Sequence, residues 1–158
     1  MHIAHGVISD QKLAEPLLQL QKEHESILRK GALIAANVKD IDAKIKKDPL
    51  RKAASSIRQL RNMLLEHESK EERILAPIIL ERLDSEASAA MKNEHVQICD
   101  LLQKLEETVL QSDVKKNLRN RRNIIDLVGE VDSSIRAHFS REENVLFWLA
   151  SLHMSNSN

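Results

Sequence analysis

The chain has 158 residues, which is enough for one domain with a substantial hydrophobic core. Lys and Arg total 24, as do Asp and Glu, so net charge gives no reason to expect binding to nucleic acid or to an anionic membrane. Two Phe, one Trp and no Tyr exclude a tyrosyl radical and disfavour aromatic platforms for stacking bases.

The sequence also indicates the compartment. Its single cysteine, Cys99, excludes a disulfide within the chain and favours a reducing environment. No apolar run approaches the roughly 18 residues of a membrane span. The N-terminal stretch of residues 1–6 lacks the basic start and apolar segment of a signal peptide. We therefore expect a cytoplasmic protein that does not cross a membrane.

Four segments, separated by turn signals, carry apolar residues at the spacing of a helix. Their expected ranges are about Asp10 to Lys46 with an end near Asp48-Pro49, about Leu50 to Leu83, about Glu86 to Leu110, and about Leu118 to Leu152. Three Gly and three Pro are few, which favours long helices. Pro77 lies inside the second segment and predicts a kink or a break there.

Short connections between four such helices predict an all-α fold, an up-down-up-down antiparallel four-helix bundle. We expect residues 1–158 to form a single domain, with a core of about residues 12–150 and short tails at both ends. The basic stretch of residues 115–122 is expected to be a solvated connection between helices. Phe147 and Trp148 are expected to pack in the core.

Six polar residues occupy positions in the apolar stripes where Leu or Ile would be expected. They are His24, His67, Glu71, His95, His138 and Glu142. A buried carboxylate or imidazole without partners costs several kcal/mol. Six of them, with at least one on every helix, need a common explanation, which a metal-free structural bundle does not provide.

Two of the helices carry the same unit, His-x-x-x-Glu, at His67–Glu71 and His138–Glu142. Residues four apart lie on one helical face, so both side chains of a unit can reach one centre. Counted from expected turns near residues 48 and 114, all four histidines fall within about two helical turns of one level. Neutral imidazole and carboxylate suit iron in helical bundles. The pattern therefore predicts one metal cluster.

Two other metal sites do not fit the spacing. A ferritin-like site needs Glu-x-x-His on two helices, and no such pair occurs in the stripes. A zincin helix needs His-Glu-x-x-His, whereas the segment from His67 ends in Glu71.

The order His, His-x-x-x-Glu, His, His-x-x-x-Glu resembles the hemerythrin-like, or HHE cation-binding, domain family, over about residues 12–150. This resemblance implies a hemerythrin-like bundle that holds two iron ions (Fe²⁺ or Fe³⁺). Glu71 and Glu142 would bridge the two ions together with an oxo or hydroxo group. The four histidines would be terminal ligands, two per metal.

The chain departs from hemerythrins at one position. Those proteins carry a further histidine one turn after the third-helix histidine, and Cys99 stands there in this chain. Either the site has one more open coordination position, or Glu68 fills it, as an equivalent glutamate does in some relatives. We interpret Cys99 as a small buried hydrophobe, with approach to the metal as the alternative.

The resemblance implies a non-haem diiron protein that binds or responds to O₂, NO or iron, in sensing, scavenging or storage. The alternative is a diiron enzyme: an oxidase, a protein that detoxifies peroxide or NO, or one that donates iron to repair damaged iron centres. Turnover with NO or peroxide would separate these functions. The sequence leaves the physiological ligand, the redox partner and the oligomeric state open.

Overall fold

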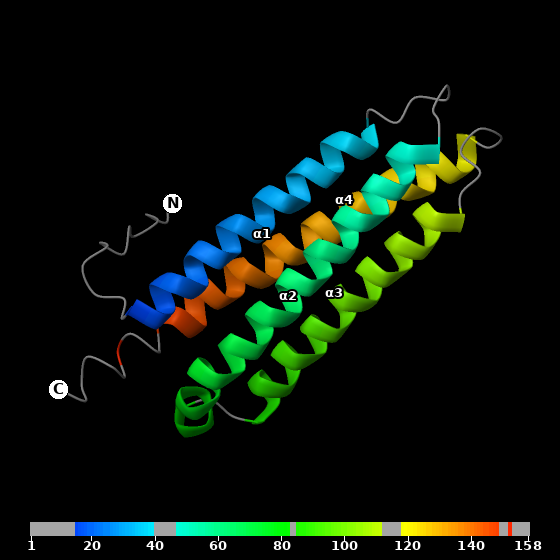
Figure 1. The fold of residues 1–158 in the computed structure, drawn as a ribbon. Helices are drawn as coiled ribbons and strands as arrows, with labels where there is room; N and C mark the ends of the chain where they lie inside the picture. Colours follow the sequence, from blue (N-terminus) through cyan, green and yellow to red (C-terminus); the bar gives the residue numbers. More distant parts are fainter. Residues whose placement is uncertain (1–14, 40–46, 83–84, 112–117, 149–151, 153–158) are drawn as a thin grey trace, which may run out of the picture.

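The computed structural model describes residues 15–39, 47–82, 85–111, 118–148 and 152. These residues form helices and no strand, which confirms the predicted all-α class. The elements are α1 (Glu15–Lys39), α2 (Lys47–Arg82), α3 (Ser85–Gln111), α4 (Leu118–Arg141) and the π-helical segment η1 (Glu142–Leu146). Figure 1 shows the four long helices lying side by side, with consecutive helices running in opposite directions.

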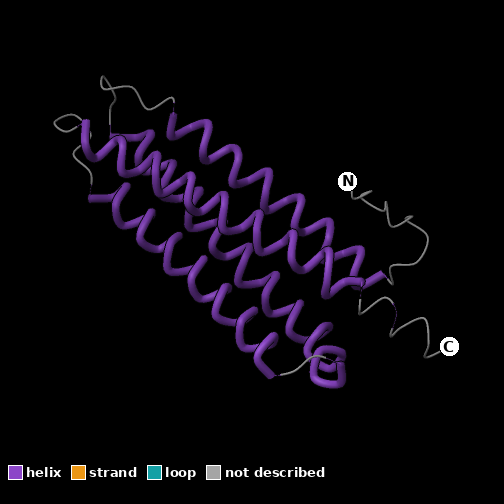
Figure 2. Tube along the Cα trace, turned by 180° about the vertical axis from the view of Figure 1, so that it is seen from behind, coloured by secondary structure: helices purple, strands orange, loops and turns teal. Residues whose placement is uncertain are grey.

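The four helices close into a ring. Each helix contacts its neighbour in the chain, and α4 returns to pack against α1. The view from behind in Figure 2 shows the same arrangement, and in Figure 1 the start of α1 and the end of α4 lie at the same end of the bundle. Each helix therefore presents one face to a shared interior, as the predicted up-down-up-down bundle requires.

The boundary between the first two helices differs from the prediction. Asp48-Pro49, expected near the end of the first helix, lies in the first turn of α2, which begins at Lys47. Proline fits there because the first backbone N–H groups of a helix have no partner within the helix. The predicted helical stretches 10–14 and 40–46 lie outside the described residues.

At Pro77, where we predicted a kink or a break, α2 continues to Arg82 without a break. Figures 1 and 2 show the last turns of α2 pointing away from the axis of the earlier turns. A proline inside a helix removes one backbone hydrogen bond and bends the helix without necessarily ending it. The structure therefore shows the other predicted outcome, a bend.

The end of the fourth helix holds a feature that the sequence did not indicate. From Glu142 to Leu146 the helix widens into one π-helical turn, in which the backbone N–H of Phe147 donates to the carbonyl oxygen of Glu142. The extra residue in this turn rotates everything after it relative to a regular α-helix. Phe147 is accordingly 2% exposed, whereas Trp148, which we expected in the core, is 48% exposed.

The largest buried apolar cluster lies on one side of the predicted polar level, and a smaller set of buried apolar side chains, Leu17, Leu20, Leu75, Met91 and Phe147, lies on the other. In α1 the buried apolar cluster lies after His24, in α2 it lies before His67, and in α3 it lies after His95. In α4 it precedes His138, with Phe139 added directly after it. Since the helices alternate in direction, these segments share the end of the bundle that holds the α1–α2 and α3–α4 connections.

Candidate metal centre

The structure brings all six predicted donor residues into one level of the bundle. His24 lies on α1, His67 and Glu71 lie on α2, His95 lies on α3, His138 lies on α4, and Glu142 is the first residue of η1. All six side chains are buried, and the most exposed of them, His95, is only 5% exposed. The helical spacing therefore gathers, from four helices, side chains that are far apart in the sequence.

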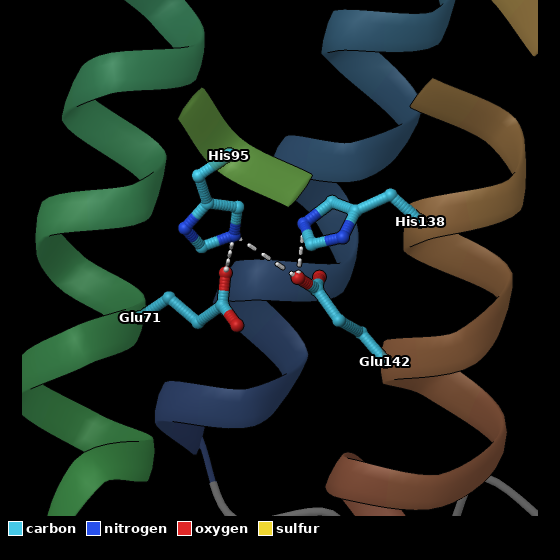
Figure 3. A group of neighbouring side chains, drawn as sticks. All are labelled: Glu71, His95, His138 and Glu142. Carbon is cyan, nitrogen blue, oxygen red and sulfur yellow. Dashed lines mark ion pairs between the residues drawn. The ribbon is translucent and has the colours of Figure 1, made fainter. Parts of the chain in front are cut away.

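The donor atoms form two groups that share Glu142. One group contains Glu71, His95, His138 and Glu142, and the other contains His24, His67 and Glu142. Within each group, one donor atom from every residue lies within 4.8 Å of the others. Figure 3 shows the first group, with both carboxylates pointing toward the two imidazoles.

The two oxygens of Glu142 face different groups. Its Oε2 lies 3.0 Å from Nε2 of His24. Its Oε1 lies 2.5 Å from Nε2 of His138 and 3.5 Å from Nε2 of His95. A carboxylate in this position can donate one oxygen to each of two cations.

Glu71 also lies between the two groups. Its Oε2 is 3.5 Å from Nε2 of His95 and 3.7 Å from Nε2 of His67. The Nε2 atoms of His24 and His67 lie 2.9 Å apart, so these two imidazoles also turn the same nitrogen inward. All four histidines thus direct Nε2 toward the two carboxylates.

Several buried atoms of this cluster lack a partner that suits them. Within the described part of the chain, six have no hydrogen bond: both oxygens of Glu71, both oxygens of Glu142, and Nε2 of His95 and His138. Their ion-pair distances to one another come without hydrogen-bond geometry. Buried polar atoms nearly always have hydrogen-bond partners, so six neighbouring atoms without one are unusual. Cations would accept lone pairs from all of these atoms, and the donor set therefore fits a metal.

The pKa shifts of the cluster also fit a cation-binding site. Burial raises the pKa of Glu71 to about 7, because it disfavours the ionised carboxylate. Burial, together with the charge of the neighbouring His24, lowers the pKa of His67 to about 4. For His95 burial acts in the same direction, but contacts with Glu142 and Glu71 outweigh it and raise the pKa to about 10. A cation bound here would compete with protons for these imidazoles and carboxylates.

Three of the four imidazoles are anchored from outside by a carboxylate. Nδ1 of His24 lies 2.8 Å from Glu143 Oε1 and Nδ1 of His67 lies 3.1 Å from Glu23 Oε2. Nδ1 of His138 lies 2.8 Å from Glu94 Oε2. In a neutral imidazole, an Nδ1–H that donates to a carboxylate leaves Nε2 free to bind a metal, which is the usual outer support of a metal-ligating histidine.

Two of these anchors are near copies of each other. In both, the carboxylate lies 44 residues before its histidine. Glu23 is paired with Lys70 Nζ at 2.7 Å, and Glu94 is paired with Arg141 Nη2 at 2.8 Å. We did not predict these carboxylates from the sequence. The available signal was a Glu directly before the histidine of the first and third helices.

Aromatic rings cover the site on the side of His24. The Phe139 ring stacks on its imidazole with centroids 3.8 Å apart and planes 10° apart. The Phe147 ring stacks at 5.4 Å and 18°. The π-helical turn places Phe147 here, so this irregularity sets which ring packs against His24, one of the six predicted donors.

Cys99 and Glu68 lie beside the His95 and His138 group without belonging to it. The Cys99 thiol is 4.0 Å from Glu68 Oε1, and burial raises its pKa to about 11, so it stays protonated. Burial also raises the pKa of Glu68, while the charges of His95 and His138 act in the opposite direction. Cys99 is only partly buried. Its thiol is thus neither fully buried nor within either donor group.

A family model described as the hemerythrin HHE cation-binding domain matches residues 15–150. No match was found among curated proteins or among solved structures. Within the described residues, no helix is both long enough and apolar enough to span a membrane.

Proposed function

Because the chain belongs to the family of hemerythrin HHE cation-binding domains, we propose that it binds two iron ions between His24, His67, Glu71, His95, His138 and Glu142. We further propose that this diiron site binds a small molecule, O₂ or NO, in sensing, scavenging or storage. The lone Cys99 supports a reducing, cytoplasmic compartment for such a protein.

The observation that carries this proposal is the position of Glu142. Its two oxygens face different histidine groups, and both of them lack hydrogen-bond partners within the described residues. A single mononuclear site would need only one of the two groups. Two groups that share one carboxylate are the arrangement expected for a bridged pair of cations.

The donor types favour iron over zinc. Structural zinc takes four ligands in a closed tetrahedron, often with cysteine thiolates. Here four imidazoles and two carboxylates converge, a set that suits iron in helical bundles. When bound, the iron pair would supply one-electron chemistry and a coordination position for a small ligand. The protein's own residues would hold the imidazoles in place and exclude bulk water.

The test begins with metal content. We expect two irons per chain after anaerobic loading with Fe²⁺, and an optical spectrum that changes on exposure to O₂ or NO. One zinc and no iron, after expression in iron-rich medium, would contradict the diiron site. Turnover of NO or peroxide beyond one equivalent would indicate the enzyme that we keep as the alternative.

Matched carboxylate variants test which residues hold the metal. Glu142→Gln should lower iron affinity most, by about 10- to 100-fold or more, because both groups use this side chain. Glu71→Gln should also lose iron, and Glu68→Gln should lose less than either, because Glu68 lies outside both groups. Glu25→Gln, at an exposed position beside His24, is the control. Equal loss of iron in the Glu68 and Glu142 variants would show that our ligand set is incomplete.

A further inference from the structure

We infer that the two metal positions are unequal, and that the position formed by His95 and His138 is the one from which iron exchanges. This inference rests on the proposed two-iron site and adds a property to it. Three independent features distinguish the halves: the outer anchoring of the imidazoles, the covering of the site, and the space that leads to it.

In the half formed by His24 and His67, both imidazoles are fixed from outside. Glu143 contacts Nδ1 of His24, and Glu23 contacts Nδ1 of His67. Glu23 is itself held by Lys70. Neither ring can turn away from the metal level without breaking a charge-assisted hydrogen bond.

In the other half only one imidazole is fixed. Glu94 contacts Nδ1 of His138, but no described residue forms a hydrogen bond with Nδ1 of His95. The counterpart of Glu143 would be Glu72, because each residue directly follows the glutamate of a His-x-x-x-Glu unit. The Glu72 side chain is exposed. His95 is therefore the least constrained of the four histidines, and it is also the most exposed.

The two halves also differ in how they are covered. Phe139 and Phe147 stack on His24 and close that side with apolar rings. A groove of about 600 Å³ between α3 and α4 reaches His138, with Glu94, Asp100 and Glu130 among its lining residues. The pocket that reaches His67 measures only about 130 Å³. Both linings contain carboxylates and cationic side chains, so the difference between the two sides is the room that a hydrated cation finds, which is larger on the His138 side.

One feature acts in the opposite direction. Glu71 belongs to the group of His95 and His138, so that group has one more donor than the other. Donor number governs how tightly an ion is held at equilibrium. The rate of exchange depends in addition on whether a ligand can swing away and whether a chelator can approach. The unanchored His95 and the groove that reaches His138 both favour exit from this half.

The experiment measures iron release from the full-length protein. The chain is loaded with two equivalents of Fe²⁺ under anaerobic conditions and mixed with excess ferrozine, and the coloured complex is followed over time. We expect two phases of equal amplitude, with one iron leaving at least about tenfold faster than the other, as expected where outer support differs. Two irons that leave in a single phase would overturn the inference while leaving the proposed function intact. Loading of fewer than two irons would overturn both.

Two matched variants identify the phases. Glu94→Gln should accelerate the fast phase by about tenfold and leave the slow phase unchanged, because it weakens the only anchor in its half. Glu23→Gln changes the equivalent residue of the other half and should accelerate only the slow phase. Acceleration of the fast phase by Glu23→Gln would overturn the assignment.

Histidine variants give a second measurement. His95→Ala and His24→Ala should each retain about one iron, because each removes a ligand from one half. The iron left in His95→Ala should leave at the slow rate, and that left in His24→Ala at the fast rate. Equal rates in the two variants would also overturn the inference.

Discussion

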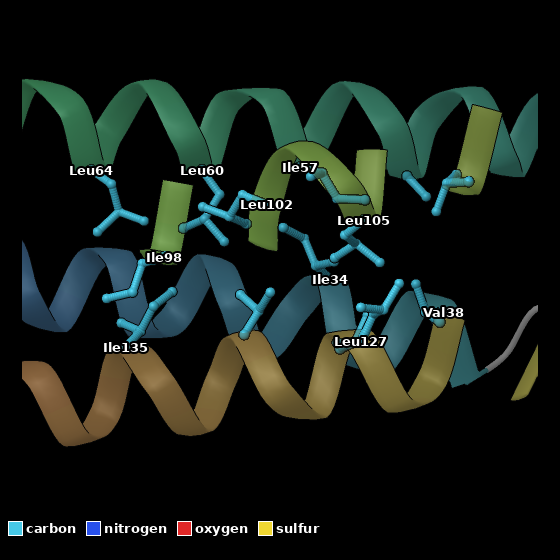
Figure 4. Packing of buried hydrophobic residues seen from close by; sticks show 14 of the residues in the cluster. Ile34, Val38, Ile57, Leu60, Leu64, Ile98, Leu102, Leu105, Leu127 and Ile135 are labelled. Atoms are coloured by element: carbon cyan, nitrogen blue, oxygen red, sulfur yellow. The ribbon is translucent and has the colours of Figure 1, made fainter. Parts of the chain in front are cut away.

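The apolar end of the bundle and the level of the six donors use the same helices in different ways. At the apolar end, toward the α1–α2 and α3–α4 connections, Leu and Ile side chains from all four helices meet in one cluster, shown in Figure 4. One level further along, the same helical faces carry imidazoles and carboxylates (Figure 3). A change of side chain along one face, with no change of backbone, separates the two regions over most of the bundle.

The comparison teaches where stability and function reside. Burial of a Leu or Ile side chain stabilises the fold by roughly 1.5–3 kcal/mol, and this gain does not depend on any ligand. Burial of a carboxylate or imidazole is unfavourable until a partner satisfies it. We therefore expect the apolar end to stabilise the fold without a ligand, and the level of the six donors to become stable only when metal is bound.

Removal of the metal is the strongest test of this comparison. At a thousandfold excess over its dissociation constant, a bound metal should stabilise the fold by about 4 kcal/mol, or about 10 °C in melting temperature. The apo protein should remain largely helical, because the apolar end does not use the metal. Acid should also lower stability, since imidazole must be neutral to bind a metal and is protonated as pH falls.

Thermal melts of apo and iron-loaded protein, followed by circular dichroism, measure this effect. Iron-loaded protein near neutral pH should melt highest, and apo protein should melt lower with a similar starting helical signal. Identical melting temperatures at verified full loading would mean that the six residues do not form a shared site. Loss of most helical signal on iron removal would mean that the apolar end cannot hold the fold alone.

A cavity in the apolar end should lower stability by an amount that does not depend on whether iron is bound. Leu102 is fully buried, and Leu102→Ala should lower the free energy of unfolding by about 3 kcal/mol, with or without iron. The residue lies about 10 Å along α3 from His95, so its effect should add to that of the metal. Urea unfolding of both forms measures the difference. Leu110→Ala, on the same helix at a 54% exposed position, should change stability by less than about 0.5 kcal/mol.

The apolar end could be predicted from the sequence because its signal is periodic. In α3 the expected stripe residues Ile98, Leu102, Leu105 and Val109 all belong to this buried cluster, and Met91, on the other side of His95, is buried as well. The meeting of the six donors at one level followed from the same periodicity, because they continue the stripes. The same helical periodicity therefore predicted both the four-helix fold and the meeting of the six donors.

Three features had no comparable signal. The π-helical turn at Glu142 depends on packing between helices, since Phe147 reaches His24 only once the bundle has formed. Glu23 and Glu94 lie about 100° around the helix from the histidines they precede, which placed them on the expected surface. Their role emerges only when a neighbouring helix brings a second histidine to them.

The smallest expected change in stability comes from the backbone of α4 rather than from the apolar end or the six donors. Gly129 lies inside α4 at an exposed position, and a Cβ atom there would meet no atom within 4 Å. Gly129→Ala should raise the free energy of unfolding by about 0.5–1 kcal/mol, because glycine loses more backbone entropy in a helix than alanine. Ala137→Gly, at another exposed position of α4, should lower it by a similar amount. Urea unfolding gives the sign for each variant, and iron titration should give two equivalents for Gly129→Ala. A gain in stability that appears only in the iron-loaded form would mean that the backbone of α4 is strained by the metal level, and that the two ends of the bundle are coupled.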